Sequence, residues 1–186
     1  MNSTTDKIIA AAVALGITAL LIAGVSMAQK PSVVASARAA AVPAPIETAS
    51  SSAVASGQLE TVVFAGGCFW GVQGVFQHVK GVQRAVSGYA GGNASDANYE
   101  LVSSGTTGHA EAVQVVYDAA QVSYGKLMQV FFSVVHDPTQ LNYQGPDHGT
   151  HYRTAVFTTT PAKHSATKSY IAKLHKAKTF TALIAT

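Results

Sequence analysis

Residues 59–71 read Leu-Glu-Thr-Val-Val-Phe-Ala-Gly-Gly-Cys-Phe-Trp-Gly, and the rest of the chain can be placed around them. The β-branched and aromatic residues at 61–65 predict a strand. The apolar spacing over 72–78 predicts a helix that begins directly after the glycines. Cys68 and Trp70 are the only cysteine and the only tryptophan in 186 residues, and both stand at this junction.

A lone thiol between a strand and a helix is a candidate nucleophile. The first N–H groups of a helix and the positive end of its dipole favour a thiolate at that position. The flanking glycines allow a tight turn that leaves the sulfur uncovered. The alternative is a buried structural thiol, with Phe69 and Trp70 as ordinary core residues. On spacing alone, both interpretations of Cys68 stay open.

The N-terminus carries an uncharged apolar run, Ile8 to Ala28, which as a helix would span roughly 30 Å, the thickness of a bilayer core. Its length favours a retained signal anchor. Ser26-Met27-Ala28 would suit cleavage of a signal peptide instead. Either form predicts a membrane-anchored or exported protein, in the bacterial periplasm. Lys30 and Arg38 follow the run while only Lys7 precedes it, so a cytoplasmic orientation stays open.

The chain therefore divides into residues 1–30, a linker over 31–57 and a folded domain over 58–186. The linker is rich in Ala, Ser, Val and Pro. The domain holds nine Lys or Arg against seven Asp or Glu, so it is near neutral. Most of its lysines fall in one predicted helix after Pro161, which indicates a solvated helix face and no nucleic-acid partner. We expect a monomer.

Hydrophobic patterning predicts an α+β fold, a ferredoxin-like two-layer sandwich with an added C-terminal helix and strand. The order is β-α-β-β-α-β, followed by α-β. The predicted strands are 59–65, 82–89, 109–117, 153–159 and 180–184. The predicted helices are 68–77, one capped by Ser123, and one begun by Thr160-Pro161 and running to about 178, with a helical turn near 99–103.

Two polar stretches lie near the cysteine end of the predicted sheet. Counting by two along 109–117 places Glu111 on the same face as Val113, Val115 and Tyr117, which makes it a candidate buried acid with a raised pKa. The other face of this strand is also apolar, so an exposed edge position for Glu111 remains an alternative. The second stretch is a long polar loop over 136–151, of a kind that often carries function.

These residues together resemble the peptide methionine sulfoxide reductase A family, over the whole of the domain from about residue 60. The matching motifs are Gly66-Gly67-Cys68-Phe69-Trp70-Gly71, Ser87-Gly88-Tyr89-Ala90-Gly91-Gly92, Tyr99, Gly108-His109-Ala110-Glu111-Ala112, His136-Asp137-Pro138 and Asn142-Tyr143-Gln144-Gly145-Pro146-Asp147-His148-Gly149-Thr150-His151-Tyr152-Arg153. The resemblance implies reduction of the S epimer of methionine sulfoxide, free or in proteins, as a repair of oxidised proteins.

The resemblance also implies roles for individual residues. Cys68 attacks the sulfoxide sulfur and becomes a sulfenic acid, and Glu111 donates a proton to the departing oxygen. The Tyr99 and Tyr152 hydroxyls hold that oxygen, and Asp147 supports the hydrogen-bond network. The methyl group is walled by the aromatic pair Phe69 and Trp70. His109 and His151 are interpreted as structural, and no bound cofactor or metal site is expected.

Two departures from the family pattern matter. The chain has no second cysteine that might resolve the sulfenic acid, so an outside thiol such as thioredoxin, glutaredoxin or a small thiol must reduce Cys68. The chain also stops at Thr186, where family members usually continue, which indicates a shortened or divergent member. A rival hypothesis is another thiol-dependent redox enzyme, such as a peroxide reductase. A Cys-His hydrolase and a binding module with an inert thiol are further alternatives.

Overall fold

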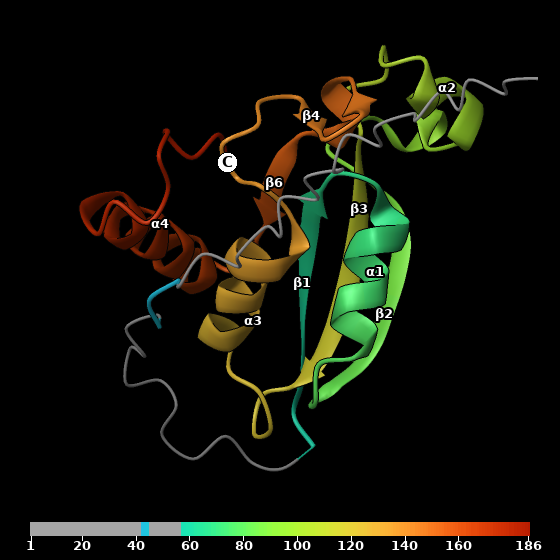
Figure 1. Cartoon of the computed structure of the whole chain (residues 1–186). Coiled ribbons are helices and arrows are strands. Elements are labelled where there is room, and N and C mark those ends of the chain that lie inside the picture. Colours follow the sequence, from blue (N-terminus) through green and yellow to red (C-terminus); the bar gives the residue numbers. More distant parts are fainter. Residues whose placement is uncertain (1–41, 45–56) are drawn as a thin grey trace, which may run out of the picture. The chain divides into compact units, whose positions relative to one another are not determined.

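The computed structural model describes residues 42–44 and 57–186, and its framework is a four-stranded antiparallel sheet (Figure 1). The strands are β1 (Leu59–Gly66), β2 (Val82–Ala90), β3 (Ala110–Asp118) and β6 (Thr154–Phe157). Their order across the sheet is β2-β3-β1-β6. This is the strand order of a ferredoxin-like sandwich, so the predicted fold class is confirmed.

The helices pack on one face of this sheet and form the main core. They are α1 (Phe69–Gln77), α3 (Tyr124–Val130), which continues as one π-helical turn (Phe131–Val135), and α4 (Pro161–Lys176). Figure 1 shows α1 and α3 in front of the strands, with α4 beside α3. Fully buried side chains fill the space between the layers, among them Val62, Phe64, Val72, Phe76, Val113, Val115, Leu127, Phe131, Phe132 and Leu174.

The opposite face of the sheet carries mostly small side chains. Ala65, Ala110 and Ala112 are buried there, with Ala155 and Phe157 packed against them. Because side chains alternate along a strand, Phe64 faces the helices while Ala65 faces away from them. Side chains therefore alternate between the two faces of the sheet along β1 and β3, as the side-chain period of two requires.

The helix starts follow the sequence rules for capping. Pro161 is the first residue of α4, and Thr160 precedes it. The Thr160 hydroxyl accepts a hydrogen bond from the backbone N–H of Lys163 at 3.2 Å. Ser123 does the same for Lys126 at 3.1 Å at the start of α3. The predicted turn near 99–103 is the short helix α2 (Tyr99–Ser103), which is capped by Asn98. Such caps satisfy first-turn N–H groups that have no partner inside the helix.

The structure corrects two local predictions. Residues 180–184 form no strand; instead the Ile184 N–H meets Nε2 of His175 at 3.3 Å, and the Ala185 N–H donates to the Pro138 carbonyl at 2.8 Å. The side chains of Phe180 and Ile184 in this C-terminal segment pack against the main core. The predicted loop 136–151 is also more regular than expected. It contains a two-stranded ribbon of β4 (Tyr143–Gln144) and β5 (Asp147–His148), and the 3-10 turn Thr150–Tyr152 follows.

The predicted membrane segment Ile8–Ala28 lies outside the described residues. Among residues 42–44 and 57–186, no helix combines the length and the apolar character that crossing a bilayer requires.

Candidate active site

One terminus of each of the four strands lies at the same end of the sheet, and these strand termini position the predicted site residues. Strands β1 and β2 end there, while β3 and β6 begin there, since each is antiparallel to its neighbour. Tyr89 of β2 pairs with Glu111 of β3, and Gly66 of β1 pairs with Thr154 of β6. The chain that leaves β1 therefore reaches Cys68 close to Glu111 and to the segment that precedes β6.

Cys68 is the N-cap residue of α1, and it is partly exposed. Its carbonyl accepts the first helical hydrogen bonds, from Gly71 N–H at 3.1 Å and Val72 N–H at 3.3 Å. Its side chain makes no capping hydrogen bond. The sulfur is thus held at the positive end of a helix without being used to build that helix.

Gly67 fixes how the chain turns into Cys68. Its φ is +92°, a conformation that L side chains rarely adopt, and a Cβ built there would lie 2.7 Å from Cγ of Gln144. The Gln144 amide is itself held by the backbone of Asp137, to whose carbonyl it donates at 2.7 Å and from whose N–H it accepts at 3.0 Å. The ribbon loop is therefore clamped against the turn that carries the thiol.

Glu111 is the buried acid next to this turn. Its side chain is 4% exposed, and Oε2 accepts a hydrogen bond from the Phe69 backbone N–H at 2.9 Å. Burial raises the pKa of Glu111, while the Phe69 N–H and the nearby His151 act in the opposite direction and Asp147 adds to the rise. Glu111 is thus buried, and an exposed edge position is excluded because β3 lies between β2 and β1.

Two tyrosines, Tyr89 and Tyr152, lie near the acid, and Tyr99 lies near both of them. The pKa of Tyr152 is raised by partial burial and then by the nearby charges of Glu111, Asp147, Cys68 and Tyr99, so these groups share one electrostatic environment. The pKa of Tyr89 is raised by burial and by Glu111 and Tyr99 in the same way. Tyr99 itself, on α2, is 63% exposed.

The two aromatic residues after Cys68 differ in exposure. Phe69 is 9% exposed and joins the core, with its ring 5.7 Å from the ring of Tyr89. Trp70 is 76% exposed, and its ring lies 6.4 Å from that of Phe69. An apolar surface beside Cys68 is thus partly built into the core and partly open to solvent.

Several residues that sequence reasoning did not single out hold this site together. Tyr89 pairs with Glu111, and Gln144 covers Gly67. Arg153 donates to the Thr150 carbonyl at 3.0 Å and to the Gly108 carbonyl at 2.9 Å, which joins the segments before β6 and before β3. All three lie inside the quoted motifs, so the motifs themselves were the available signal.

Two histidines border the site, His151 buried and His136 partly buried, and within the described part of the chain some of their ring nitrogens have no hydrogen-bond partner. His136 packs on Phe131, with ring centroids 4.2 Å apart, and burial lowers the pKa of His136 to about 4. His151 is 6% exposed, with its ring 4.1 Å from that of Tyr152 and its Nδ1 unpartnered. The structural interpretation of His109 fits its contacts, because Nδ1 accepts from Gly92 N–H and Nε2 lies 2.8 Å from the Asn93 carbonyl.

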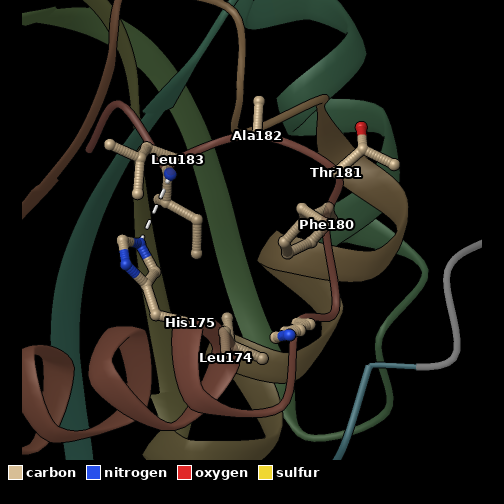
Figure 2. Close-up of a pocket in the computed structure, with 8 residues that line it drawn as sticks. Leu174, His175, Phe180, Thr181, Ala182 and Leu183 are labelled. Carbon is tan, nitrogen blue, oxygen red and sulfur yellow. Dashed lines mark hydrogen bonds between the residues drawn. The ribbon is translucent and has the colours of Figure 1, made fainter.

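The site is built neither around a metal cluster nor in the cavity beside α4. Within the described part of the chain, no group of three His, Cys, Asp or Glu side chains is placed to hold a metal ion. A cavity of about 270 Å³ lies elsewhere, between the end of α4 and the following tail (Figure 2). Its walls include Leu174, His175 and Phe180, and Cys68 and Glu111 are not among them.

We predict that Gly67→Ala destabilises the protein by about 2–4 kcal/mol, because it combines a strained φ with the collision against Gln144. Gly57→Ala is the matched control, since Gly57 has the same φ of +92° and no atom of the described residues lies within 4 Å of a Cβ built there. Urea unfolding should show about 1–2 kcal/mol of loss for Gly57→Ala, the strain alone. Equal losses for the two variants would contradict the role of Gln144.

The fold and site define an α+β sandwich in which a thiol at the N-cap position of a helix lies beside a buried carboxylic acid. A family model described as peptide methionine sulfoxide reductase matches residues 60–186, and the chain belongs to this family. Peptide methionine sulfoxide reductase MsrA 2 of Mesorhizobium japonicum is 60% identical over 127 residues, which cover 68% of this chain and 65% of that protein. The protein of the same name from Synechocystis is 52% identical over 127 residues, 68% of this chain and 59% of its own length.

Solved structures agree with this assignment. Mxr1 from Saccharomyces cerevisiae in reduced form is 29% identical with a TM-score of 0.64, covering 69% of this chain and 74% of that chain. Methionine sulfoxide reductase A of Corynebacterium diphtheriae is 34% identical with a TM-score of 0.55, over 75% of this chain and 69% of that chain. The matched region thus spans somewhat less than two thirds of the two MsrA 2 relatives.

Proposed function

We propose that this protein reduces the S epimer of methionine sulfoxide to methionine, in proteins or free, and so repairs oxidised proteins. The observation that carries the proposal is the hydrogen bond from Phe69 N–H to Glu111 Oε2, one residue away from the only thiol of the chain. A sulfoxide needs both an attacking sulfur and an acid, because its oxygen leaves only when it is protonated. Burial raises the pKa of Glu111 and so favours the protonated carboxyl that this step needs.

In the first half-reaction the Cys68 sulfur attacks the sulfoxide sulfur while Glu111 donates its proton to the oxygen. A sulfur–sulfur bond forms, and transfer of the oxygen to Cys68 then breaks it together with the original sulfur–oxygen bond. The substrate sulfur is reduced by two electrons, and the Cys68 sulfur is oxidised by two electrons to the sulfenic acid. Glu111 regains a proton from solvent before the next turnover.

The other predicted residues complete this proposal. The Tyr99 and Tyr152 hydroxyls donate to the sulfoxide oxygen, in keeping with their shared environment with Glu111. Phe69 and Trp70 contact the methyl group, with Phe69 as the fixed wall and the exposed Trp70 as the outer wall. Asp147 supports the hydrogen-bond network around Tyr152.

Regeneration of Cys68 consumes an external thiol reductant, with thioredoxin, glutaredoxin or a small thiol as candidates. Two thiols reduce the sulfenic acid to the free cysteine, and they leave as a disulfide with one water. The chain itself has no second cysteine to share this step. Support for a protein reductant comes from yeast Mxr1, which has also been solved in complex with Trx2. No bound cofactor is part of the proposal.

The test is thiol-dependent turnover of methionine sulfoxide, with the two epimers assayed separately. We expect loss of the S epimer only, in the presence of reductant. Turnover of the R epimer alone, or of neither, would refute the proposal. Thiol-dependent consumption of peroxide without sulfoxide turnover would favour the rival peroxide reductase.

We predict that Trp70→Ala lowers kcat/KM for the S epimer by about 5- to 150-fold, equivalent to about 1–3 kcal/mol, because the variant removes the outer wall of the methyl site. Stability should change little, since Trp70 is 76% exposed. Leu59→Ala is the control, because Leu59 is also an exposed large side chain, at the opposite end of β1. Initial rates at varied substrate concentration check this prediction, and equal effects from both variants would contradict it.

We further propose that the uncharged run Ile8–Ala28 anchors the chain in a membrane or directs its export, with the domain in the bacterial periplasm. Membrane fractionation of the full chain, followed by protease treatment of intact spheroplasts, tests both parts. Protection of the domain from the protease would support the cytoplasmic orientation instead.

A further inference from the structure

A short piece of the linker, Val42-Pro43-Ala44, lies against α3 and α4. Its three consecutive carbonyl oxygens each accept a hydrogen bond from a different helix side chain. Gln129 Nε2 of α3 donates to Val42 O at 3.0 Å, and the Tyr170 hydroxyl of α4 donates to Pro43 O at 2.9 Å. Lys173 Nζ of α4 donates to Ala44 O.

The side chains that receive this segment are held in place by the domain. The Gln129 amide is oriented because its Oε1 accepts from Lys126 Nζ at 2.9 Å, which leaves Nε2 directed at Val42 O. Tyr170 is 4% exposed, its ring lies 5.9 Å from that of Phe132, and burial raises its pKa to about 12. Both donors are thus preorganised for an acceptor at this position.

The segment also contributes to the core. Val42 is 8% exposed and belongs to the same buried cluster as Phe131, Phe132 and Leu174. Proline at the next position has no N–H, so the middle residue of the segment offers only its carbonyl for pairing. An apolar anchor followed by a row of carbonyl acceptors matches what α3 and α4 present.

We propose that α3 and α4 form a docking site for an extended peptide segment, and that its occupant is this chain's own Val42-Pro43-Ala44, which acts as an arm of the catalytic domain. The proposal goes beyond the proposed reductase activity and does not rest on it. The arm adds to the direct contact between the two helices, in which the Tyr124 hydroxyl of α3 lies 2.6 Å from the Thr167 hydroxyl of α4.

Docking of the arm has two consequences. Helix α3 continues into Phe131, whose ring lies 3.1 Å from a Cβ built at Gly66. Because Val42 of the arm belongs to the same buried cluster as Phe131, the arm supports the packing next to the Cys68 turn. The linker between the N-terminal segment and the first docked residue also shortens from 31–57 to 31–41. Each residue removed from a linker takes about 3.3–3.6 Å from its maximum reach.

The test is thermal unfolding of the full chain carrying Val42→Ser, with Val34→Ser in the same linker as the matched control. We expect Val42→Ser to lower Tm by roughly 3–6 °C, because it removes a buried aliphatic side chain, and Val34→Ser to leave Tm unchanged. Tyr170→Phe, which keeps the ring and removes the hydroxyl, should also lower Tm. The double variant Val42→Ser/Tyr170→Phe should lose less than the sum of the two single losses, since both changes release the same arm.

Partial digestion supplies a second measurement that does not depend on the size of a Tm shift. Lys173→Ala should speed cleavage by a broad-specificity protease at 42–44 several-fold, whereas Lys168→Ala, an exposed lysine on the same helix, should not. Equal Tm values for the Val42 and Val34 variants, additive losses in the double variant, or cleavage at 42–44 that Lys173→Ala does not change would each overturn the proposal.

Discussion

Cys68→Ser is expected to abolish methionine sulfoxide turnover, with a loss of roughly 10⁴-fold or more in kcat, because a hydroxyl does not take up the oxygen of the sulfoxide as a thiolate does. Cys68 is the only sulfur in the site, and the chain has no other cysteine to replace it. The measurement is single-turnover loss of the S epimer with reductant withheld.

The structure provides an internal control for this variant. Cys68 occupies the N-cap of α1 without a side-chain capping bond, and serine is among the preferred N-cap residues. Cys68→Ser should therefore be as stable as the parent chain, or more stable by up to about 1 kcal/mol. A loss of activity that came with unfolding would not support the assignment, so thermal unfolding is measured alongside.

Mass analysis of the parent protein after one turnover without reductant completes the argument for Cys68. We expect one added oxygen on the peptide that contains Cys68, because the sulfenic acid has no second cysteine in the chain to react with. The Ser variant should show no added oxygen. An unmodified Cys68 after confirmed turnover would contradict the proposed nucleophile.

Glu111→Ala is expected to lower kcat by about 10²–10⁴-fold, the usual contribution of a general acid. Glu111→Gln should retain more activity than the alanine variant. In the parent chain Oε2 accepts from the Phe69 N–H, and a glutamine can place its carbonyl oxygen there. Its amide N–H₂ is then directed toward the substrate oxygen as a hydrogen-bond donor. Equal activity of the alanine variant and the parent would refute the general-acid role.

The raised pKa of Glu111 also predicts the pH dependence of activity. The acid must be protonated to act, so kcat should fall as the pH rises through the raised pKa of Glu111. The glutamine variant has no carboxyl to titrate, so its profile should lack the alkaline fall that Glu111 causes.

The same shift has a consequence for stability. The folded-state pKa of Glu111 lies above the usual value of 4.5, so this side chain contributes fully to the free energy of unfolding below about pH 4.5. The contribution is lost as the pH rises through the folded-state pKa. Glu111→Gln removes this loss. The free energy of unfolding of the glutamine variant should therefore increase relative to that of the parent as the pH rises. Denaturant unfolding of both proteins at several pH values checks the sign of this difference.

Local patterns in the sequence determined much of this fold and part of its site. The side-chain period of two aligned Glu111 with Val113 and Val115, which made it a candidate buried acid, although the other face of the strand is also apolar. The glycines before Cys68 marked the turn from strand to helix, and Gly67 proves to need its positive φ. Thr160-Pro161 marked the start of α4 through capping chemistry that is complete within a few residues.

Tertiary structure alone decided the features that depend on distant partners. Residues 180–184 have the composition of a strand, yet they form none: the Ile184 N–H donates to the His175 side chain, and the Ala185 N–H that follows donates to the Pro138 carbonyl. The position of Val42–Ala44 against α3 and α4 is likewise determined by hydrogen bonds from side chains that are distant in the sequence. The closeness of Tyr152, Asp147 and Cys68 to Glu111 follows from strand order and register, since four strand ends meet at one sheet edge. The sequence therefore determined that a thiol follows a strand and that an acid is aligned with valines, because turns and alternation act between near neighbours, while the burial of Glu111 depends on the inner position of β3 in the sheet. Only packing across the sheet brought the two together.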